Sequence, residues 1–119
     1  MNFSCGTEMV DDVALITLTG EVDLYTAPEF KQQLLKQIED GTLQIVVDFS
    51  DTTFIDSTTL GVLVGGVKRL RPAGGMLAIV CADRNIIKIF EITGLHRVFE
   101  IHATREAAIE AVKAGAPAG

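Results

Sequence analysis

Apolar side chains alternate with polar ones in some stretches of the chain and form short continuous runs in others, and both patterns predict strands. Residues 13–19 alternate, which is typical of a half-buried strand. The segment 43–49 contains the continuous apolar run Ile45-Val46-Val47, and 76–81 is apolar throughout, as expected for strands that are covered on both faces. A weaker strand at 3–9 would form a hairpin with 13–19, and a short strand is expected at 98–101.

Between these strands, apolar residues recur every three or four positions, which predicts helices. The first helix begins with a capping pattern in which Thr26 stands three residues before a glutamate, and Gly41 is placed to end it. The second helix is expected over Ser57–Leu70, because a proline and two glycines follow it. Asp83 and Thr104 are placed to cap two further helices.

The order of these elements is strand, strand, helix, and then strand and helix in alternation. Alternation of this kind implies parallel strands joined by helical crossovers, while the opening hairpin adds an antiparallel pair. The prediction is therefore an α/β fold, with a mixed, mostly parallel sheet of about four to five strands and about four main helices. A chain of 119 residues fits one domain, expected over 1–113 with a flexible tail at 114–119.

The charge of the chain narrows the classes of partner. A net charge of −6 argues against nucleic acid and against an anionic membrane surface, because both are bound through clustered lysine and arginine. The chain shows no export signal and no apolar run long enough to span a bilayer, so a cytoplasmic location is expected. Cys5 and Cys81 then fit a reducing compartment as small hydrophobic residues, with a redox-sensing role as the alternative.

The second helix has an unusual outer face. Its core face comprises Leu60, Leu63, Val64, Val67 and Leu70. The opposite arc carries Ser57, Thr58, Gly61, Gly65, Lys68 and Arg69, with Val62 and Gly66 beside them. Glycines spaced along one helix face leave a shallow strip where another backbone can come close, despite a cost of about 1 kcal/mol each relative to alanine. This strip either packs against a neighbouring helix of the same domain or stays open for a partner.

Ser57 stands at the N-terminal end of that strip. The first backbone N–H groups of a helix have no internal acceptor, and the helix dipole is positive there, so a phosphate on Ser57 would be tolerated. It would still bring a charge of about −1.5 to −2 next to Asp56. The simpler explanation is that Asp56 or Ser57 only caps the helix.

The segment Phe54-Ile55-Asp56-Ser57-Thr58, followed by Leu60-Gly61-Val62-Leu63, resembles the phosphorylation segment of bacterial anti-sigma factor antagonists, the STAS domain proteins. The resemblance extends to about Val112, because four other segments agree with that family in order and spacing. These segments are Leu18-Thr19-Gly20-Glu21-Val22-Asp23, Ile45-Val46-Val47-Asp48, Ile87-Lys88-Ile89-Phe90 and Ile92-Thr93-Gly94-Leu95 before Val98-Phe99.

The resemblance implies that Ser57 is phosphorylated by a cognate anti-sigma factor, a GHKL-type serine kinase. It implies that the unmodified chain binds this kinase and frees a sigma factor, that phosphorylation breaks the complex, and that a protein serine phosphatase resets the switch. Asp23 and Asp56 match acidic positions that flank the serine in the family. No cofactor and no metal are implied.

One position departs from the family pattern. The family usually has glycine two residues after the phosphorylated serine, and here the residue is Thr59. A β-branched residue is stiffer than glycine and brings its own hydroxyl. It could narrow the access of a kinase, or be harmless if the position is already helical. Thr58 and Thr59 are also alternative phosphate acceptors.

Little in the sequence indicates an enzyme. His96 and His102 lie at no metal-ligand or catalytic-triad spacing. Acidic residues at predicted strand ends leave open a receiver-like protein that is phosphorylated on an aspartate. They are Glu21, Asp23, Asp48 and Asp56. A docking module without phosphorylation is the third possibility.

Overall fold

The computed structural model describes residues 3–115, which form a five-stranded sheet and four α-helices. The strands are β1 (Ser4–Val10), β2 (Val13–Val22), β3 (Gln44–Ile55), β4 (Met76–Val80) and β5 (Glu100–His102). The helices are α1 (Ala27–Glu39), α2 (Ser57–Leu70), α3 (Arg84–Ile92) and α4 (Arg105–Lys113), with 3-10 turns η1 (Arg71–Ala73) and η2 (Leu95–Arg97).

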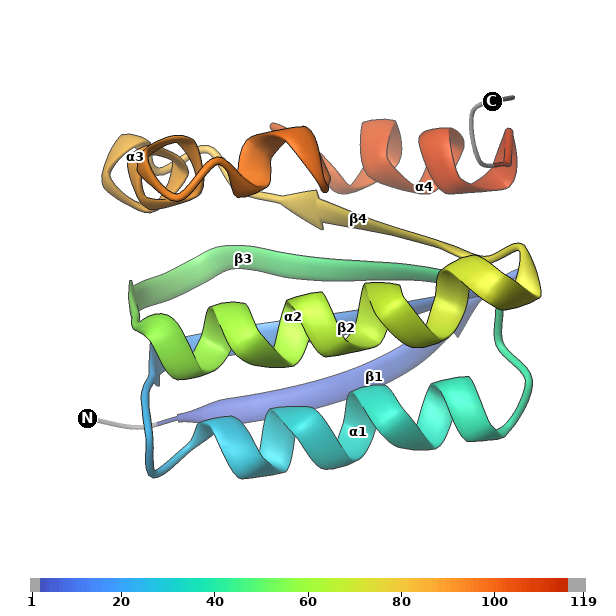
Figure 1. Ribbon diagram of the computed structural model, residues 1–119, viewed down its shortest axis with the longest axis horizontal. Coiled ribbons are helices and arrows are strands. Elements are labelled where there is room, and N and C mark those ends of the chain that lie inside the picture. The colour runs from blue at the N-terminus through green and yellow to red at the C-terminus, as the bar shows by residue number, and fades with distance from the viewer. Residues whose placement is uncertain (1–2, 116–119) are drawn as a thin grey trace.

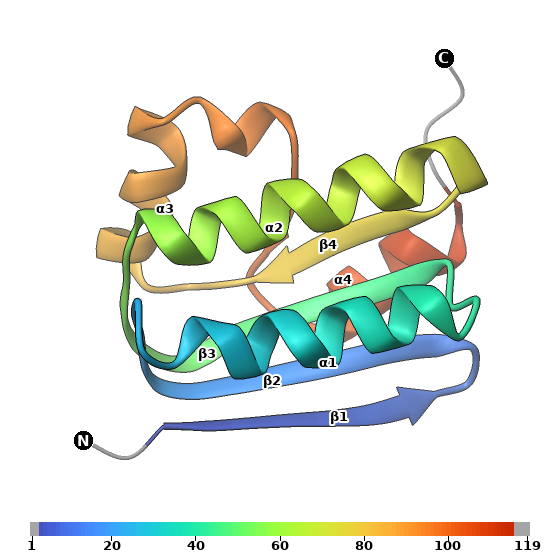
Figure 2. The ribbon, with the colours of Figure 1, turned by 60° about the horizontal axis from the view of Figure 1, so that its bottom comes forward.

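The strands lie side by side in chain order, β1-β2-β3-β4-β5 (Figure 2). β1 and β2 form an antiparallel hairpin in which Val10 pairs with Val13, and the tight turn between them holds Asp11 at a φ of 56°. All other neighbours are parallel, because each is reached through a helical crossover. The predicted α/β fold with a mixed, mostly parallel sheet is confirmed.

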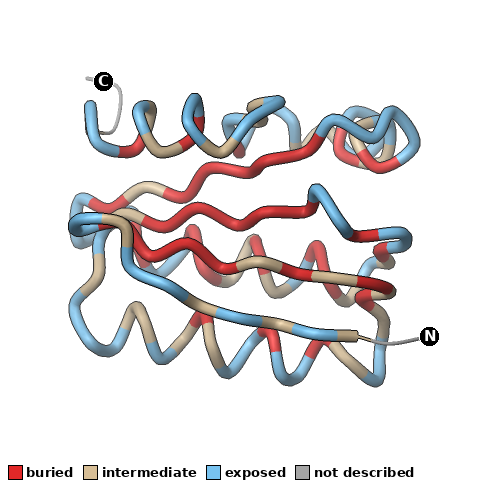
Figure 3. Tube along the Cα trace, turned by 180° about the vertical axis from the view of Figure 1, so that it is seen from behind, coloured by how far each residue is buried: buried red, intermediate tan, exposed pale blue. Residues whose placement is uncertain are grey.

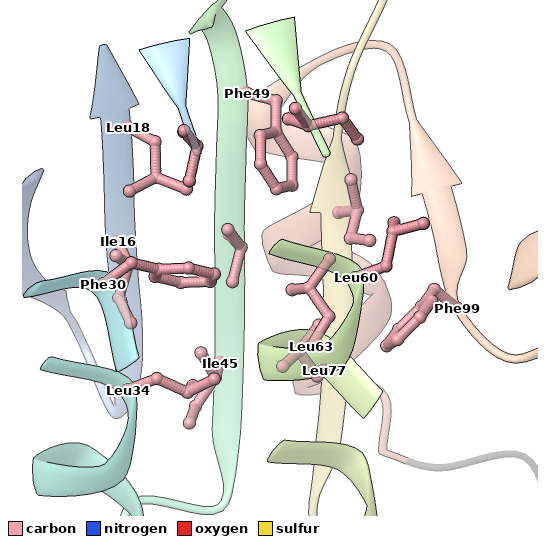
Figure 4. Packing of buried hydrophobic residues seen from close by; sticks show 14 of the residues in the cluster. Ile16, Leu18, Phe30, Leu34, Ile45, Phe49, Leu60, Leu63, Leu77 and Phe99 are labelled. Atoms are coloured by element: carbon pink, nitrogen blue, oxygen red, sulfur yellow. The ribbon is translucent and has the colours of Figure 1, made fainter. Parts of the chain in front are cut away.

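α1 and α2 lie side by side on one face of the sheet, and both begin at the same end of the molecule (Figures 1 and 2). Each turns an apolar stripe toward the strands. Phe30 and Leu34 of α1 are fully buried over β2 and β3, and Leu63 of α2 is fully buried close to Leu77 of β4, as Figure 4 shows. Phe90 of α3 joins the same core and meets the ring of Phe99 edge-on, with 6.2 Å between the ring centres.

α4 covers the opposite face of the sheet. Its buried residues Ala108 and Val112 pack on a second apolar cluster formed by β2, β3 and β4. The three central strands are therefore covered on both sides, and they are the most buried part of the chain (Figure 3). The apolar runs within 43–49 and 76–81 predicted this correctly for β3 and β4, whereas β2, expected to be half-buried, is covered on both faces.

Two central strands run further than expected. β2 was expected to end before Gly20 and continues to Val22, while β3 was expected to end at Phe49 and continues to Ile55. Gly20 takes a φ of 88°, and the pairing register shifts on both sides of it, which lets the two strands stay paired through an irregular stretch. The polar residues that suggested a loop therefore lie within a strand.

The remaining boundaries differ by a few residues. β1 is displaced by one residue from the expected 3–9. The last strand starts at Glu100 rather than Val98. The backbone N–H groups of Val98 and Phe99 donate to the carbonyl of Leu95 in η2, so these two residues do not pair with the sheet. Of the predicted tail at 114–119, the first two residues still hydrogen-bond back onto α4, and 116–119 lie outside the described residues.

Candidate functional site

β2 and β3 end at the same edge of the sheet, and this brings two acidic residues together. Val22 is paired with Ile55, so Asp23 and Asp56 occupy equivalent positions directly after the two strands. Neighbouring strands lie about 4.8 Å apart. The predicted proximity of Asp23 to the Ser57 segment therefore follows from the strand register.

Asp56 caps α2. Its Oδ1 accepts hydrogen bonds from the backbone N–H groups of Thr58, at 2.9 Å, and Thr59, at 3.3 Å. The capping role considered for Asp56 is thus confirmed, and Ser57 becomes the first residue of the helix, with an exposed side chain. The cap changes the expected environment of a phosphate on Ser57. The N–H groups of Thr58 and Thr59 already donate to Asp56. They are therefore not available to a phosphate on Ser57, which would lie next to the Asp56 carboxylate.

Asp23 shapes the loop from β2 to α1. Its Oδ1 accepts from the backbone N–H groups of Tyr25, at 2.9 Å, and Thr26, at 3.1 Å. The Thr26 hydroxyl donates to the carbonyl of Glu21 at 2.9 Å and accepts from the Asp23 N–H, so it makes no capping bond to α1. The predicted capping pattern at Thr26 is therefore wrong, because Thr26 instead closes the loop around Asp23.

This loop presents apolar side chains to solvent, which was not predicted from the sequence. Leu24 is 62% exposed and Tyr25 is 87% exposed. Phe54, near the end of β3, is 46% exposed, because it points away from the neighbouring buried Ile55. A Leu-Tyr pair directly after an aspartate in a strand-to-helix loop was the available signal. Large apolar side chains at one edge, together with Asp23, are typical of a protein-binding surface.

Thr59 ties the start of α2 to the end of β2. Its side chain is fully buried, and its hydroxyl donates to the carbonyl of Val22 at 2.9 Å. The position is helical, which is the condition under which threonine in place of the family's glycine was expected to be harmless. Because its hydroxyl is buried and bonded, Thr59 is no accessible phosphate acceptor, whereas Thr58 is half-buried.

One of the three glycines of α2 packs against a neighbouring helix, and the other two stay open, so each of the two explanations considered for the strip holds for part of it. A Cβ added at Gly66 would lie 2.9 Å from a methyl carbon of Leu34, so Gly66 packs against α1. A Cβ added at Gly61 or Gly65 would have no atom within 4 Å. Gly61 and Gly65 are therefore open, while Gly66 belongs to the core.

Gly61 and Gly65 lie in a groove of about 630 Å³ between α1 and α2, which we call the α1–α2 groove. Val62 and Arg69, two other predicted partner-binding residues, line it as well. Lys68 is exposed on α2 but lies outside the groove lining. Val64, expected on the core face, is half-buried.

Asp48 is not part of this site. It lies within β3, is fully buried and forms an ion pair with Arg105 of α4, which raises the pKa of the guanidinium. The Ser50 hydroxyl and backbone N–H also donate to it, at 2.5 and 2.8 Å. The expectation that Asp48 stands at a strand end is wrong, because β3 continues past it to Ile55.

The two thiols are poorly suited to redox sensing. Burial, helped by the charge of Glu29, raises the pKa of Cys5 to about 12. Burial also raises the pKa of Cys81, whose side chain is only 2% exposed. Both sulfurs are therefore protonated near neutral pH, and a thiol reacts as its thiolate.

Over residues 3–115, no group of three or more histidine, cysteine, aspartate or glutamate side chains comes together in a way that could hold a metal ion. Within the same part of the chain, every helix is too short or too polar to cross a membrane.

Comparison with known proteins adds to this geometry. The family model of the STAS domain matches residues 6–108 of the chain. The anti-sigma-B factor antagonist of Bacillus subtilis is 30% identical over 110 residues, which are 92% of this chain and all of that protein. The crystal structure of an anti-sigma factor antagonist from Mycobacterium paratuberculosis superimposes with a TM-score of 0.87 and 26% identity, over 94% of this chain and 95% of the other. A Bacillus cell fate determinant, SpoIIAA, solved in its phosphorylated form, matches with a TM-score of 0.74 and 26% identity, over 92% of this chain and 99% of that one.

Proposed function

The chain belongs to the STAS domain family, and from that membership we propose that it is an anti-sigma factor antagonist switched by phosphorylation of Ser57. In its unmodified form it binds an anti-sigma factor and thereby releases a sigma factor. The observation that carries the proposal is the position of Ser57. It is the exposed first residue of α2, next to the acidic pair Asp23 and Asp56 and at the same edge as exposed apolar side chains.

The geometry supplies a physical reason for the switch. A partner that covers Leu24, Tyr25 and Phe54 must remove water from this edge of the sheet. A phosphate on Ser57 adds a charge of about −1.5 to −2 to a surface that already holds two carboxylates. Two helix donors that could have neutralised it are bound by Asp56. Removing that charge from water is costly, and phosphorylation therefore opposes docking.

The proposed partners follow from this role. The anti-sigma factor is a GHKL-type serine kinase that phosphorylates the chain it binds, and a protein serine phosphatase restores the unmodified form. The chain itself contributes a surface and a phosphate acceptor rather than a catalytic group. Sigma factors act on RNA polymerase in the cytoplasm, so the proposed role places the chain there.

The test uses the purified chain, its cognate anti-sigma factor kinase and the sigma factor that this kinase holds. With ADP, the unmodified chain should displace the sigma factor from the kinase. With ATP, mass spectrometry should locate one phosphate on Ser57, and Ser57→Ala should displace sigma factor but stay unmodified. An acid-stable phosphate elsewhere would contradict the proposal, as would an acyl phosphate on Asp23. Sigma factor release with no phosphate at all would indicate a docking module.

A further inference from the structure

The α1–α2 groove has a chemistry that identifies one kind of occupant. We propose that it receives an amphipathic helix of the anti-sigma factor, with the apolar face of that helix in the groove and acidic side chains along its edges. This inference rests on the proposed function, because it assigns a binding mode to the same partner.

The groove is apolar along its floor. Ala27 and Leu34 of α1 are buried there, and Leu35 and Val62 are half-buried beside them. Its volume, about 630 Å³, is that of a binding site for several side chains. Open space above Gly65 lets the occupant approach the backbone of α2 closely. The floor therefore favours a segment that presents a row of apolar side chains.

The walls favour a helix over an extended segment. The two walls are the helices α1 and α2, whose interior backbone N–H and C=O groups already form hydrogen bonds within each helix. An extended peptide laid between them would find no row of backbone partners and would leave its own groups unpaired. A helix satisfies its backbone internally and can insert side chains spaced every three or four residues.

The charge of the groove is opposite to that of the protein. The chain carries a net charge of −6, yet the charged residues that line the groove are Lys31 on α1 and Arg69 on α2, both basic and both exposed. An occupant with aspartate or glutamate on its two edges would meet one cation on each wall. A basic or neutral helix would gain nothing from either.

The groove also leads to the switch. Leu24 and Thr58 line it, and Thr58 follows Ser57 directly. An acidic helix seated in the groove would thus have one end near the phosphate acceptor. A phosphate on Ser57 would then repel the acidic occupant, in addition to the cost of removing water from the phosphate. The groove and the Ser57 edge form one continuous surface.

The test compares charge reversals at matched positions. Lys31→Glu/Arg69→Glu reverses the charge of the groove. Arg84→Glu/Lys88→Glu changes the net charge equally on α3, where both side chains are exposed and line no part of the groove. Dissociation constants for the anti-sigma factor kinase with ADP are measured by calorimetry in low and high salt, after circular dichroism has shown that each variant is folded.

We expect the groove variant to bind at least about tenfold more weakly at low salt and the α3 variant to stay within about twofold, since charges at an interface act locally. Salt should weaken binding of the wild-type chain more than that of the groove variant. Hydrogen exchange on the bound kinase should protect one helix with apolar residues at three- or four-residue spacing and acidic residues beside them.

The outcomes separate the two claims. If the wild-type chain does not bind the kinase, the proposed function fails and this inference with it. If the wild-type chain binds and is phosphorylated on Ser57, but the groove variant binds equally well, the inference alone is overturned. Equal weakening of both variants would overturn it too, because the effect would then reflect overall charge. Protection of an extended or basic segment would do the same.

Discussion

Two aspartates, Asp48 within β3 and Asp56 directly after it, have different roles. Asp48 lies inside the strand, fully buried under α4, and is neutralised by Arg105 and by hydrogen bonds from Ser50. Asp56 lies just past the strand end, half-buried, and caps α2 beside the exposed Ser57. A buried charge must be satisfied within the fold, whereas a charge at the sheet edge stays available to a partner. The comparison teaches that acidic residues near a strand end cannot be assigned a function before their burial is known.

We expect the largest effect on stability at the buried ion pair of Asp48 and Arg105. Arg105→Ala leaves the Asp48 carboxylate buried with only its hydrogen bonds from Ser50, and should lower the free energy of unfolding by about 3 kcal/mol. Urea denaturation measures this. Lys113→Ala on the same helix removes the partner of the exposed Asp11 and should change the urea midpoint very little. If Arg105→Ala is as stable as this control, Asp48 is no structural charge.

Thr59 connects the switch to the core and should give the next effect. Thr59→Val keeps the shape of the side chain but removes the hydrogen bond to the carbonyl of Val22, and should cost about 1 to 2 kcal/mol. Since this bond holds the start of α2 against β2, the phosphorylation rate of Ser57 should also change. Thr58→Val, at a half-buried position, is the matched control. A variant as stable as wild type would show that the bond contributes nothing.

The helix cap should matter less for stability and more for binding. Asp56→Ala removes the acceptor for the N–H groups of Thr58 and Thr59, and should cost about 1 kcal/mol. Asp56→Asn keeps the cap but removes the charge. It should therefore retain the thermal midpoint and tolerate a phosphate on Ser57 better, which calorimetry with the phosphorylated chain would detect. If the phosphorylated Asp56→Asn chain binds as weakly as the phosphorylated wild-type chain, the charge of Asp56 is irrelevant to the switch.

The smallest stability effect is expected in the α1–α2 groove. Gly65→Glu places a side chain in open space on a helix, so its thermal midpoint should match that of wild type or exceed it slightly. Partner binding should fall strongly, because the new side chain fills the groove with a negative charge. If Gly65→Glu unfolds instead, Gly65 is part of the core and the docking surface lies elsewhere.

Much of the fold was predictable because it depends on local patterns. Continuous apolar runs predicted the buried strands, and Ser57–Leu70 was predicted with both ends correct, since Asp56 and Pro72 mark them. The strand extensions were not predictable in the same way. Polar residues such as Ser50 and Asp51 do not look like a strand, and β3 continues through them because Asp51 and Thr52 still pair with Thr19 and Gly20 of β2.

The site was predictable only in part. The order of short motifs predicted Ser57 as the phosphate acceptor, which stays a prediction, and the strand register places Asp23 beside Asp56. The exposed side chains of Leu24 and Tyr25 were missed, because apolar residues in a sequence are expected to be buried. Whether Gly65 is open and Gly66 packed depends on where α1 lies, and no local pattern contains that information.

In the proposed switch, one phosphate on Ser57 converts this surface from binding to non-binding. The most direct measurement is the dissociation constant of the anti-sigma factor kinase, with ADP, for the unmodified chain and for the chain stoichiometrically phosphorylated on Ser57. We expect the phosphorylated chain to bind at least about a hundredfold more weakly, which is the size of effect that a desolvated, unpaired charge has at an interface. Equal dissociation constants for the two forms would contradict it.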